Sequence, residues 1–584
     1  MAWGLHVVHC RMELSDHSFS SALSLRVLEI LENPMHKLPD STCQLRHLRY
    51  LSLSGCSGLV NLPKSFGEDL SNLLHIDLSR CSGLETLPQS LGKLTNLLHI
   101  NLSGCSKLKN LPESLVRLIK LVHIDLSWCT GLVYLPESFG KLSNLVHVNL
   151  SECSALVKLP LSFGKLTNVQ FLNLSGCSGL VDLTQSLGKL INLLRINLSG
   201  CSGLINLPRS FGKLINLVHV DFSGCSRLVT LPESFGDLSN LLHIDLAGCH
   251  GLSYLPRSFA KLTKLQYLDI SFWSCFGVIQ SVLDGSLTSL QHLNLSHPCL
   301  SLEQHQNHLE RLPEVLSKHT GLRYLNLSMF LNPVFEAQSQ VKSQVLQRNE
   351  EQIRGCIRCI SGISSLEHLD LSQNMFLREI PECLGELSKM HTLDLSGCIR
   401  LERVAKRIGE MKSLKSILVS SCRSLKSYHL VVQAVDDVAA YGSSSNIVQL
   451  EDADFEELEI SCLENAKPTE VSQRVKFAEK RRIERLKLCW TVDHQRSMED
   501  DSLLGELVPP QSLQCLELRG CNAELDLAAC WRDNLLNLAE VTLEDVSMCS
   551  QLPPVGVLPN LKRLVLRRMS SLIQIDASVL NTSI

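Results

Sequence analysis

The chain of 584 residues has few of the features that mark several large protein classes. Aromatic residues make up only 5% of it, and its formal net charge is −4. A charge this small and negative disfavours a general nucleic-acid binder, which carries a basic surface. No apolar run approaches the roughly 18 residues of a membrane span, and no basic segment precedes the short apolar stretch at the N-terminus. We therefore expect no nucleic-acid partner, no membrane span and no secretory signal.

Enzyme motifs are missing as well. Each Gly-Lys pair, such as Gly92-Lys93 and Gly140-Lys141, is followed by leucine, so the phosphate-binding loop G-x-x-x-x-G-K-[ST] is absent. Serine, histidine and aspartate are abundant, but they recur along a repeated surface and imply no pocket for a catalytic triad. The sequence therefore predicts a protein that is not an enzyme, binds no nucleotide and needs no cofactor.

Cysteine, by contrast, recurs with a strict period of 24 residues. Residues 97–111, with the sequence L-L-H-I-N-L-S-G-C-S-K-L-K-N-L, show the phrase that surrounds it. The phrase fits the leucine-rich-repeat template L-x-x-L-x-L-x-x-N/C-x-L. One such unit cannot bury its own apolar face, so the units must stack into a solenoid. The periodic cysteines are Cys81, Cys105, Cys129, Cys153, Cys177, Cys201, Cys225 and Cys249.

The predicted fold is an α/β repeat solenoid. It is a curved leucine-rich-repeat horseshoe with a parallel sheet on its concave side and an irregular or short-helical convex side. Because side chains alternate along a strand, Ile100 points inward while His99 and Asn101 point outward. Pro112 opens the convex return, where a fixed φ and a missing N–H suit a short helix better than a strand.

The repeated cysteine is predicted to be a buried thiol that can bond to the backbone of the turn after the strand. Neighbouring cysteines lie about one strand spacing, roughly 4.8 Å, apart. Side chains in a parallel register are nevertheless poorly oriented for a disulfide. A reducing compartment is therefore favoured, which is the cytoplasm or both the cytoplasm and the nucleus.

The rhythm of the repeats divides the chain into segments. The repeat that begins at Leu25 exposes an apolar edge unless the preceding residues cover it. The basic run at 474–485 contains interleaved glutamates and is typical of a solvated helix, with a nuclear-localisation or acidic-partner patch as the alternative. The predicted segments are a tail or partial cap at 1–22, regular repeats at 23–330, a helical or mobile insertion at 331–362, repeats at 363–426, a flexible loop at 427–450 and degenerate C-terminal repeats at 451–584.

Three phrases resemble one family in particular. L-R-V-L at 25–28, with H-K-L-P-D at 36–40 and L-R-H-L-R-Y-L at 45–51, resembles the opening repeats of plant nucleotide-binding leucine-rich-repeat disease-resistance proteins. The phrase Q-L-P-P-V-G-V-L-P-N-L-K-R-L at 551–564 is similar to their late repeats, and residues 457–510 are similar to the C-terminal region of such receptors in grasses. The nucleotide-binding module that precedes the repeats in that family has no counterpart here.

The resemblance implies a sensor or regulatory region of a plant intracellular immune receptor. Its partner would be a pathogen effector, a guarded host protein, or a nucleotide-binding switch module in the same or another chain. The alternative is a stand-alone intracellular scaffold of the plant Ras-group-related leucine-rich-repeat type. The sequence does not distinguish a truncated gene from a relic or a genuine repeat-only protein.

Two outward-facing columns on the concave side are the candidate partner-binding surface. A metal ladder is disfavoured because a metal needs three or four ligands that converge at about 2.0–2.2 Å, whereas strand neighbours diverge; we predict no metal site. The interruptions of the columns, Phe171, Arg195 and Tyr267, are favoured because aromatic and arginine side chains dominate interfaces. The candidates are Tyr50, His75, Asp77, His99, His123, Asp125, His147, Phe171, Arg195, His219, Asp221, His243, Asp245, Tyr267, Asp269, His292 and Tyr324.

Overall fold

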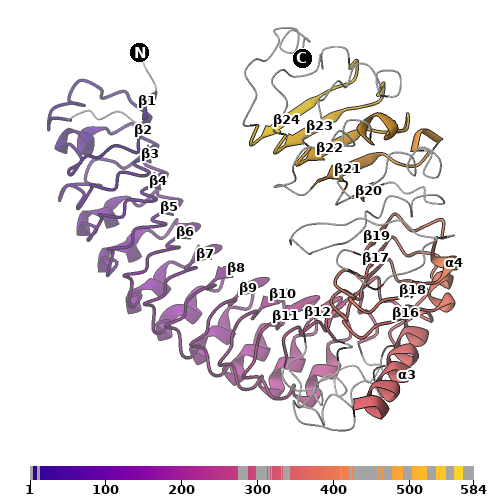
Figure 1. The fold of residues 1–584 in the computed structure, drawn as a ribbon. Coiled ribbons are helices and arrows are strands. Elements are labelled where there is room, and N and C mark those ends of the chain that lie inside the picture. The colour runs from indigo at the N-terminus through magenta and orange to yellow at the C-terminus, as the bar shows by residue number, and fades with distance from the viewer. Residues whose placement is uncertain are drawn as a thin grey trace. The chain divides into compact units, whose positions relative to one another are not determined.

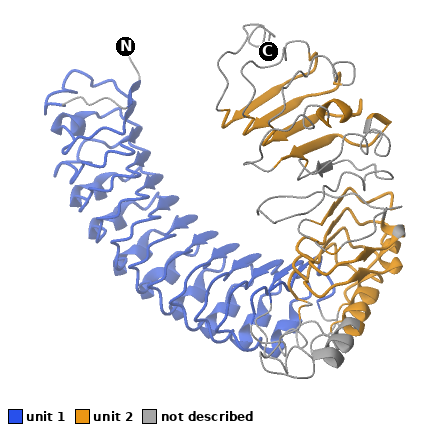
Figure 2. Cartoon of the chain, viewed as in Figure 1, with its two compact units in different colours: residues 1–304 blue, residues 305–584 orange. Residues whose placement is uncertain are grey.

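The computed structural model describes most of the repeat region (Figure 1). It divides into two compact units, residues 1–304 and residues 305–584 (Figure 2). The predicted loop at 427–450 lies outside the described residues. The described residues are 4–8, 14–273, 287–297, 312, 316, 318–330, 332, 342–409, 411–419, 422, 424, 457–460, 463, 477–479, 481–490, 503–521, 535–546 and 558–569.

Unit 1 is a curved stack of short parallel strands that pair in chain order, and the strands line its inner side (Figure 1). Each strand after β3 begins 24 or 25 residues after the one before it, so equivalent residues pair, as His99 of β5 does with His123 of β6. The predicted parallel sheet is confirmed. The strands are β1 (Gly4–Val8), β2 (Val27–Leu31), β3 (Tyr50–Ser52), β4 (His75–Asp77), β5 (His99–Asn101), β6 (His123–Asp125), β7 (His147–Asn149), β8 (Phe171–Asn173), β9 (Arg195–Asn197), β10 (His219–Asp221), β11 (His243–Asp245), β12 (Tyr267–Asp269) and β13 (His292–Asn294).

The return segments of unit 1 form short 3₁₀ helices on the outer side of the stack (Figure 1). Proline precedes most of them, with φ near the value that its ring imposes, for example −67° at Pro112. Glycine within them permits close packing, because a Cβ at Gly140 would lie 2.1 Å from the carbonyl oxygen of Ser162. The helices are Asp40–Gln44, Gln89–Lys93, Glu113–Arg117, Glu137–Lys141, Leu161–Lys165, Gln185–Lys189, Arg209–Lys213, Glu233–Asp237 and Arg257–Lys261.

The core between the two layers consists of leucine, phenylalanine and the periodic cysteine. Cys105 is fully buried, and its Sγ donates to the carbonyl oxygen of Leu78, 3.3 Å away, in the preceding repeat. Burial raises the pKa of the Cys81 thiol to about 12, so at neutral pH this group is a protonated donor and not a reactive thiolate. The cysteines of the described residues are free thiols. The predicted buried thiol is confirmed, and it joins two repeats.

The N-terminal edge of the stack is covered. β1 pairs in parallel with all five residues of β2, from Gly4 against Val27 to Val8 against Leu31. Residues within the predicted cap at 1–22 therefore shield the edge of the first repeat that carries the leucine pattern.

Unit 2 is less regular than unit 1. Within the insertion predicted at 331–362 lies α3 (Lys342–Ile360), which buries Ile353, Cys356, Ile357 and Ile360 and lies against the 3₁₀ helix Glu382–Glu386. The described part of the basic run at 474–485 is a 3₁₀ turn, Phe477–Glu479, followed by the first residue of β21; the expected solvated helix is not found there.

The strands of unit 2 pair in parallel within three groups. The first is β14 (Tyr324–Asn326), β15 (His368–Asp370), β17 (Thr392–Asp394) and β19 (Ser416–Leu418). The second is β16 (Glu379–Ile380) with β18 (Arg403–Val404), followed in the chain by the short helix α4 (Lys406–Gly409). The third is β20 (Glu457–Ile460), β21 (Arg485–Cys489), β22 (Cys515–Arg519), β23 (Glu540–Glu544) and β24 (Arg563–Arg567).

Candidate protein-interaction surface

From β3 to β13, the first outward residue of nearly every strand carries a ring, and these rings form a column. The rings of His75 and His99 lie 4.4 Å apart between centroids, and those of His99 and His123 4.3 Å apart. The stack continues to His147 at 4.3 Å and to Phe171 at a further 4.5 Å. Parallel pairing places equivalent side chains about 4.8 Å apart, so flat rings at this position stack face to face.

Arg195 interrupts the column, and a second group of rings follows it. The guanidinium of Arg195 is exposed between the strands of Phe171 and His219. Beyond it, His243 and Tyr267 stack at 3.8 Å. The structure therefore brings the predicted ring residues of unit 1 together in one column, from Tyr50 to His292; Tyr324 occupies the equivalent position of β14 in unit 2.

Burial lowers the pKa of several histidines of the column, which favours their neutral form at physiological pH. Burial, with smaller contributions from the charges of neighbouring histidines, lowers the pKa of His123 to about 4. Burial likewise lowers the pKa of His292 to about 4 and lowers that of His99. Neutral imidazoles offer aromatic surface and hydrogen-bonding edges, whereas Arg195 adds a permanent positive charge to the same column.

The acidic column beside the rings has a structural role that the sequence reasoning did not foresee. The Oδ1 atom of Asp125 accepts from the backbone N–H of Ser127 at 2.8 Å, and Asp221 does the same with Ser223. Asn101, a neutral member of this column, accepts from Ser103 in the same way. This side-chain turn ends each strand. Its signal in the sequence was the recurring D/N-x-S spacing. The same bond is made by Asp77, Asp245 and Asp269.

The remaining carboxylate oxygens of this column are partly used as well. Oδ2 of Asp125 accepts from Asn149 at 3.0 Å, and Oδ2 of Asp269 accepts from Asn294 at 2.7 Å. Burial raises the pKa of Asp245 to about 6. The acidic column therefore offers less free hydrogen-bonding capacity to a partner than its sequence suggests.

Both columns line a shallow hollow of about 350 Å³ on the strands β3 to β7. Its walls include Tyr50, His99 and His147 from the ring column and Asp77 and Asp125 from the acidic column. A hollow of this size, open along a row of strands, suits side chains of a bound protein segment.

The residue before each repeated cysteine of unit 1 has a left-handed backbone conformation, a feature that the sequence analysis missed. The residue before the repeated cysteine has a positive φ and is usually glycine, as at Gly104 with φ 74° and Gly200 with φ 68°. Trp128 takes this position with φ 59°, although its side chain is 59% exposed. Arg80 and Glu152 have the same conformation at the equivalent positions, so this turn accepts a side chain at some cost in backbone strain. The signal was S-W-C in place of S-G-C.

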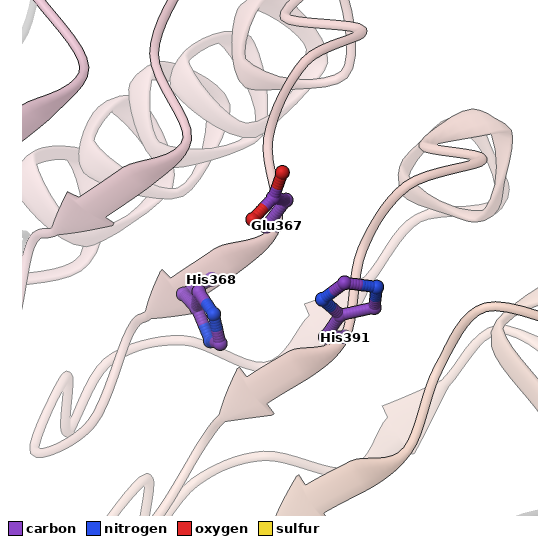
Figure 3. A group of neighbouring side chains, drawn as sticks. All are labelled: Glu367, His368 and His391. Carbon is purple, nitrogen blue, oxygen red and sulfur yellow. The ribbon is translucent and has the colours of Figure 1, made fainter.

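Unit 2 contains the group of side chains best suited to hold a metal among the described residues. Glu367, His368 and His391 each offer one ligand atom, and these atoms lie within 4.8 Å of one another (Figure 3). None of the three was among the predicted site residues. Glu367 and His368 are adjacent and His391 follows 24 residues after Glu367, a spacing that matches no recognised metal motif.

Comparison with known proteins supports the repeat assignment. Residues 447–569 match the family described as R13L1/DRL21 LRRs, and residues 365–387 match the Leucine Rich Repeat family. The chain contains a leucine-rich-repeat region. No curated protein matches it. Leucine-rich-repeat domains are typically protein-binding modules without enzymatic activity.

Two solved structures are similar to parts of the chain. A leucine-rich-repeat protein of Leptospira interrogans is 20% identical, with a TM-score of 0.48 over 70% of this chain and 100% of that chain. The leucine-rich-repeat domain of the type III effector XopL is 26% identical, with a TM-score of 0.33 over 37% of this chain and 74% of that chain. Both TM-scores are low, so the fold assignment rests on the strand ladder itself. Within the described residues, no helix combines the length and hydropathy needed to cross a bilayer.

Proposed function

We propose that this chain is the protein-binding, regulatory repeat region of a plant intracellular immune receptor. The order of its phrases carries the proposal. Phrases like the opening repeats of plant disease-resistance proteins occupy 25–51, and a late-repeat phrase lies at 551–564. The match of residues 447–569 to R13L1/DRL21 repeats adds support in the same C-terminal region.

In this proposal the chain recognises a pathogen effector, a guarded host protein or a nucleotide-binding switch module. Recognition of this kind does not require the chain to catalyse any reaction on the partner. A partner that binds one state of the switch more tightly shifts its on/off equilibrium by the difference in the two binding free energies. The repeats thus act as a sensor whose output lies in another domain or chain.

Specificity is proposed to reside where the ring column is interrupted. Phe171, Arg195 and Tyr267 differ from the histidine that recurs at their position, and Trp128 adds a large exposed ring in the turn after β6. Aromatic and arginine side chains supply most of the binding free energy in many interfaces. The exposed guanidinium of Arg195 suits an acidic or aromatic group of the partner.

Charge reversal on two faces of one repeat tests this proposal. Arg195→Glu changes the strand face, and Lys213→Glu makes the same change on an exposed lysine of the 3₁₀ helix Arg209–Lys213. The full chain is co-expressed in plant cells with nucleotide-binding modules from grass receptors, and complexes are recovered by immunoprecipitation. We expect Arg195→Glu to reduce recovery at least tenfold, since hot-spot changes cost about 2 kcal/mol or more, and Lys213→Glu to leave it unchanged.

Two results would contradict the proposal. If Arg195→Glu and Lys213→Glu had equal effects on recovery, the strand face would not be the surface that binds the partner. Specific partners that include neither a nucleotide-binding module nor a receptor-associated protein would favour the stand-alone scaffold instead.

A further inference from the structure

We propose that Glu367, His368 and His391 form a binding site for a divalent transition-metal ion of the zinc type. This inference is independent of the proposed function. Two imidazoles and one carboxylate form a ligand set that zinc and related ions favour, whereas magnesium and calcium favour oxygen ligands alone. The three residues belong to the described part of unit 2, at the starts of β15 and β17 (Figure 3).

The backbone holds two of the ligands side by side. The carbonyl oxygen of Glu367 accepts from the N–H of His391 at 2.7 Å and from the N–H of Thr392 at 3.1 Å. His368 follows Glu367 directly and begins β15. The three side chains therefore start from positions that parallel strand pairing fixes, and no long loop has to order before they meet.

The three ligand atoms are close enough together for one metal ion to bind all of them. Tetrahedral bonds of about 2.0–2.1 Å place ligand atoms roughly 3.4 Å apart. The three atoms lie within 4.8 Å of one another, so rotation of half-exposed side chains can close the difference. The side chains are only partly buried, so water or a partner side chain can complete the coordination.

Arg323 holds the carboxylate of Glu367 in place. Its Nε and Nη2 atoms donate to the two oxygens of Glu367, each at 2.8 Å. A carboxylate has about four lone-pair directions, so each oxygen keeps one for a metal. Ligating carboxylates are commonly held by such outer hydrogen bonds.

His368 occupies the repeated ring-column position, whereas Glu367 and His391 are not a product of regular repetition. The residue that precedes the ring column in unit 1 is mostly apolar, as at Leu74, Leu98 and Val122. Its carbonyl accepts the same pair of backbone N–H bonds as that of Glu367. In unit 2 this position carries Glu367 and then His391, beside the arginine at 323. The change of residue type on an unchanged backbone supports a function for the side chains.

The experiment is a calorimetric titration of the full chain with Zn²⁺. The buffer contains a phosphine reductant, which keeps the thiols reduced. The variants are His391→Ala and Glu367→Gln. The control is His47→Ala, which removes an exposed histidine of unit 1. We expect saturable binding of one ion with a micromolar Kd, weakened about tenfold or more in both variants, as loss of a supporting group alone costs 10–100-fold, and unchanged in the control.

Circular dichroism and thermal melting without metal establish that each variant is folded. Bound Zn²⁺ should raise the melting temperature of the wild type and not that of His391→Ala. A wild type without saturable binding, or variants that bind Zn²⁺ as tightly as the wild type, would overturn the proposal. A sulfur-to-metal charge-transfer band with Co²⁺ would also overturn it, because it would place the ion on cysteine.

Discussion

Unit 1 joins neighbouring repeats mainly through a regular series of buried thiols and stacked rings, whereas unit 2 keeps the buried thiol at Cys398 and adds several exposed ion pairs between repeats. In unit 1, Cys129 donates to the carbonyl of Leu102 in the repeat before it. In unit 2, Arg403 pairs with Glu379 and Arg568 with Asp545, each across one repeat. Buried contacts depend on atomic fit, while exposed pairs tolerate adjustment and are screened by salt. The regular unit is thus the more sensitive to small changes of shape.

The largest expected effect comes from adding one methyl group to the outer layer of unit 1. A Cβ on Gly164 would lie 2.2 Å from the carbonyl oxygen of Ser186, so Gly164→Ala must push neighbouring 3₁₀ helices apart. We expect a loss of about 1–3 kcal/mol in the free energy of unfolding. The control is Gly355→Ala in α3, where a Cβ would meet nothing within 4 Å.

Gly355→Ala should instead stabilise unit 2 by about 0.5–1 kcal/mol, because alanine favours a helix interior. Urea unfolding followed by circular dichroism measures both changes. Effects of equal size and sign would contradict the difference in packing between the units.

A smaller effect is expected at the left-handed turn. Trp128→Gly should stabilise the fold by about 1 kcal/mol, because glycine relieves the cost of a positive φ. Gly200→Ala, at the equivalent position with φ 68°, should destabilise it by a similar amount. If Trp128 serves recognition, Trp128→Gly also weakens partner binding while it stabilises the chain. A destabilised Trp128→Gly would show that the indole supports the fold instead.

The ring column of unit 1 predicts that stability depends on pH. The pKa of His123 is lowered from 6.5 to about 4. Between these values the unfolded chain binds the proton more readily, so stability is lost as the pH falls from 6.5 towards 4. His123→Phe keeps a ring in the stack but cannot titrate, so melting temperatures should fall less steeply with acid. An unchanged slope would mean that His123 does not contribute.

The smallest change is expected at the exposed pairs of unit 2. Arg403→Ala removes a 2.9 Å contact between Nη2 and the carboxylate of Glu379, which also pairs with Arg354. The stability should change little at low salt and not measurably at high salt, because exposed pairs are weak and screened. Urea midpoints at two salt concentrations measure it. A large loss that persists in salt would show that unit 2 also depends on fixed geometry.

Much of the fold was predictable because the same pattern of apolar and polar residues recurs in every repeat. The alternation around His99 predicted which side chains face outward, and the 24-residue period predicted the parallel sheet. The binding role of the columns stays a prediction, as do the segment boundaries. The helix expected across the basic run was wrong in its described part, which contains a 3₁₀ turn at Phe477–Glu479 and ends at Arg485, where pairing with β20 and β22 fixes an extended backbone.

The sequence by itself determined the repeat, the inward leucines and the burial of the cysteines, because covalent geometry fixes the alternation of side chains along each strand. The tertiary structure decided which atoms meet between repeats. It assigned the thiol of Cys129 to the carbonyl of Leu102, gave Trp128 its left-handed φ, and brought His391 beside Glu367. These contacts depend on rotamers and on the register of the neighbouring strand, and neither is a property of a single repeat.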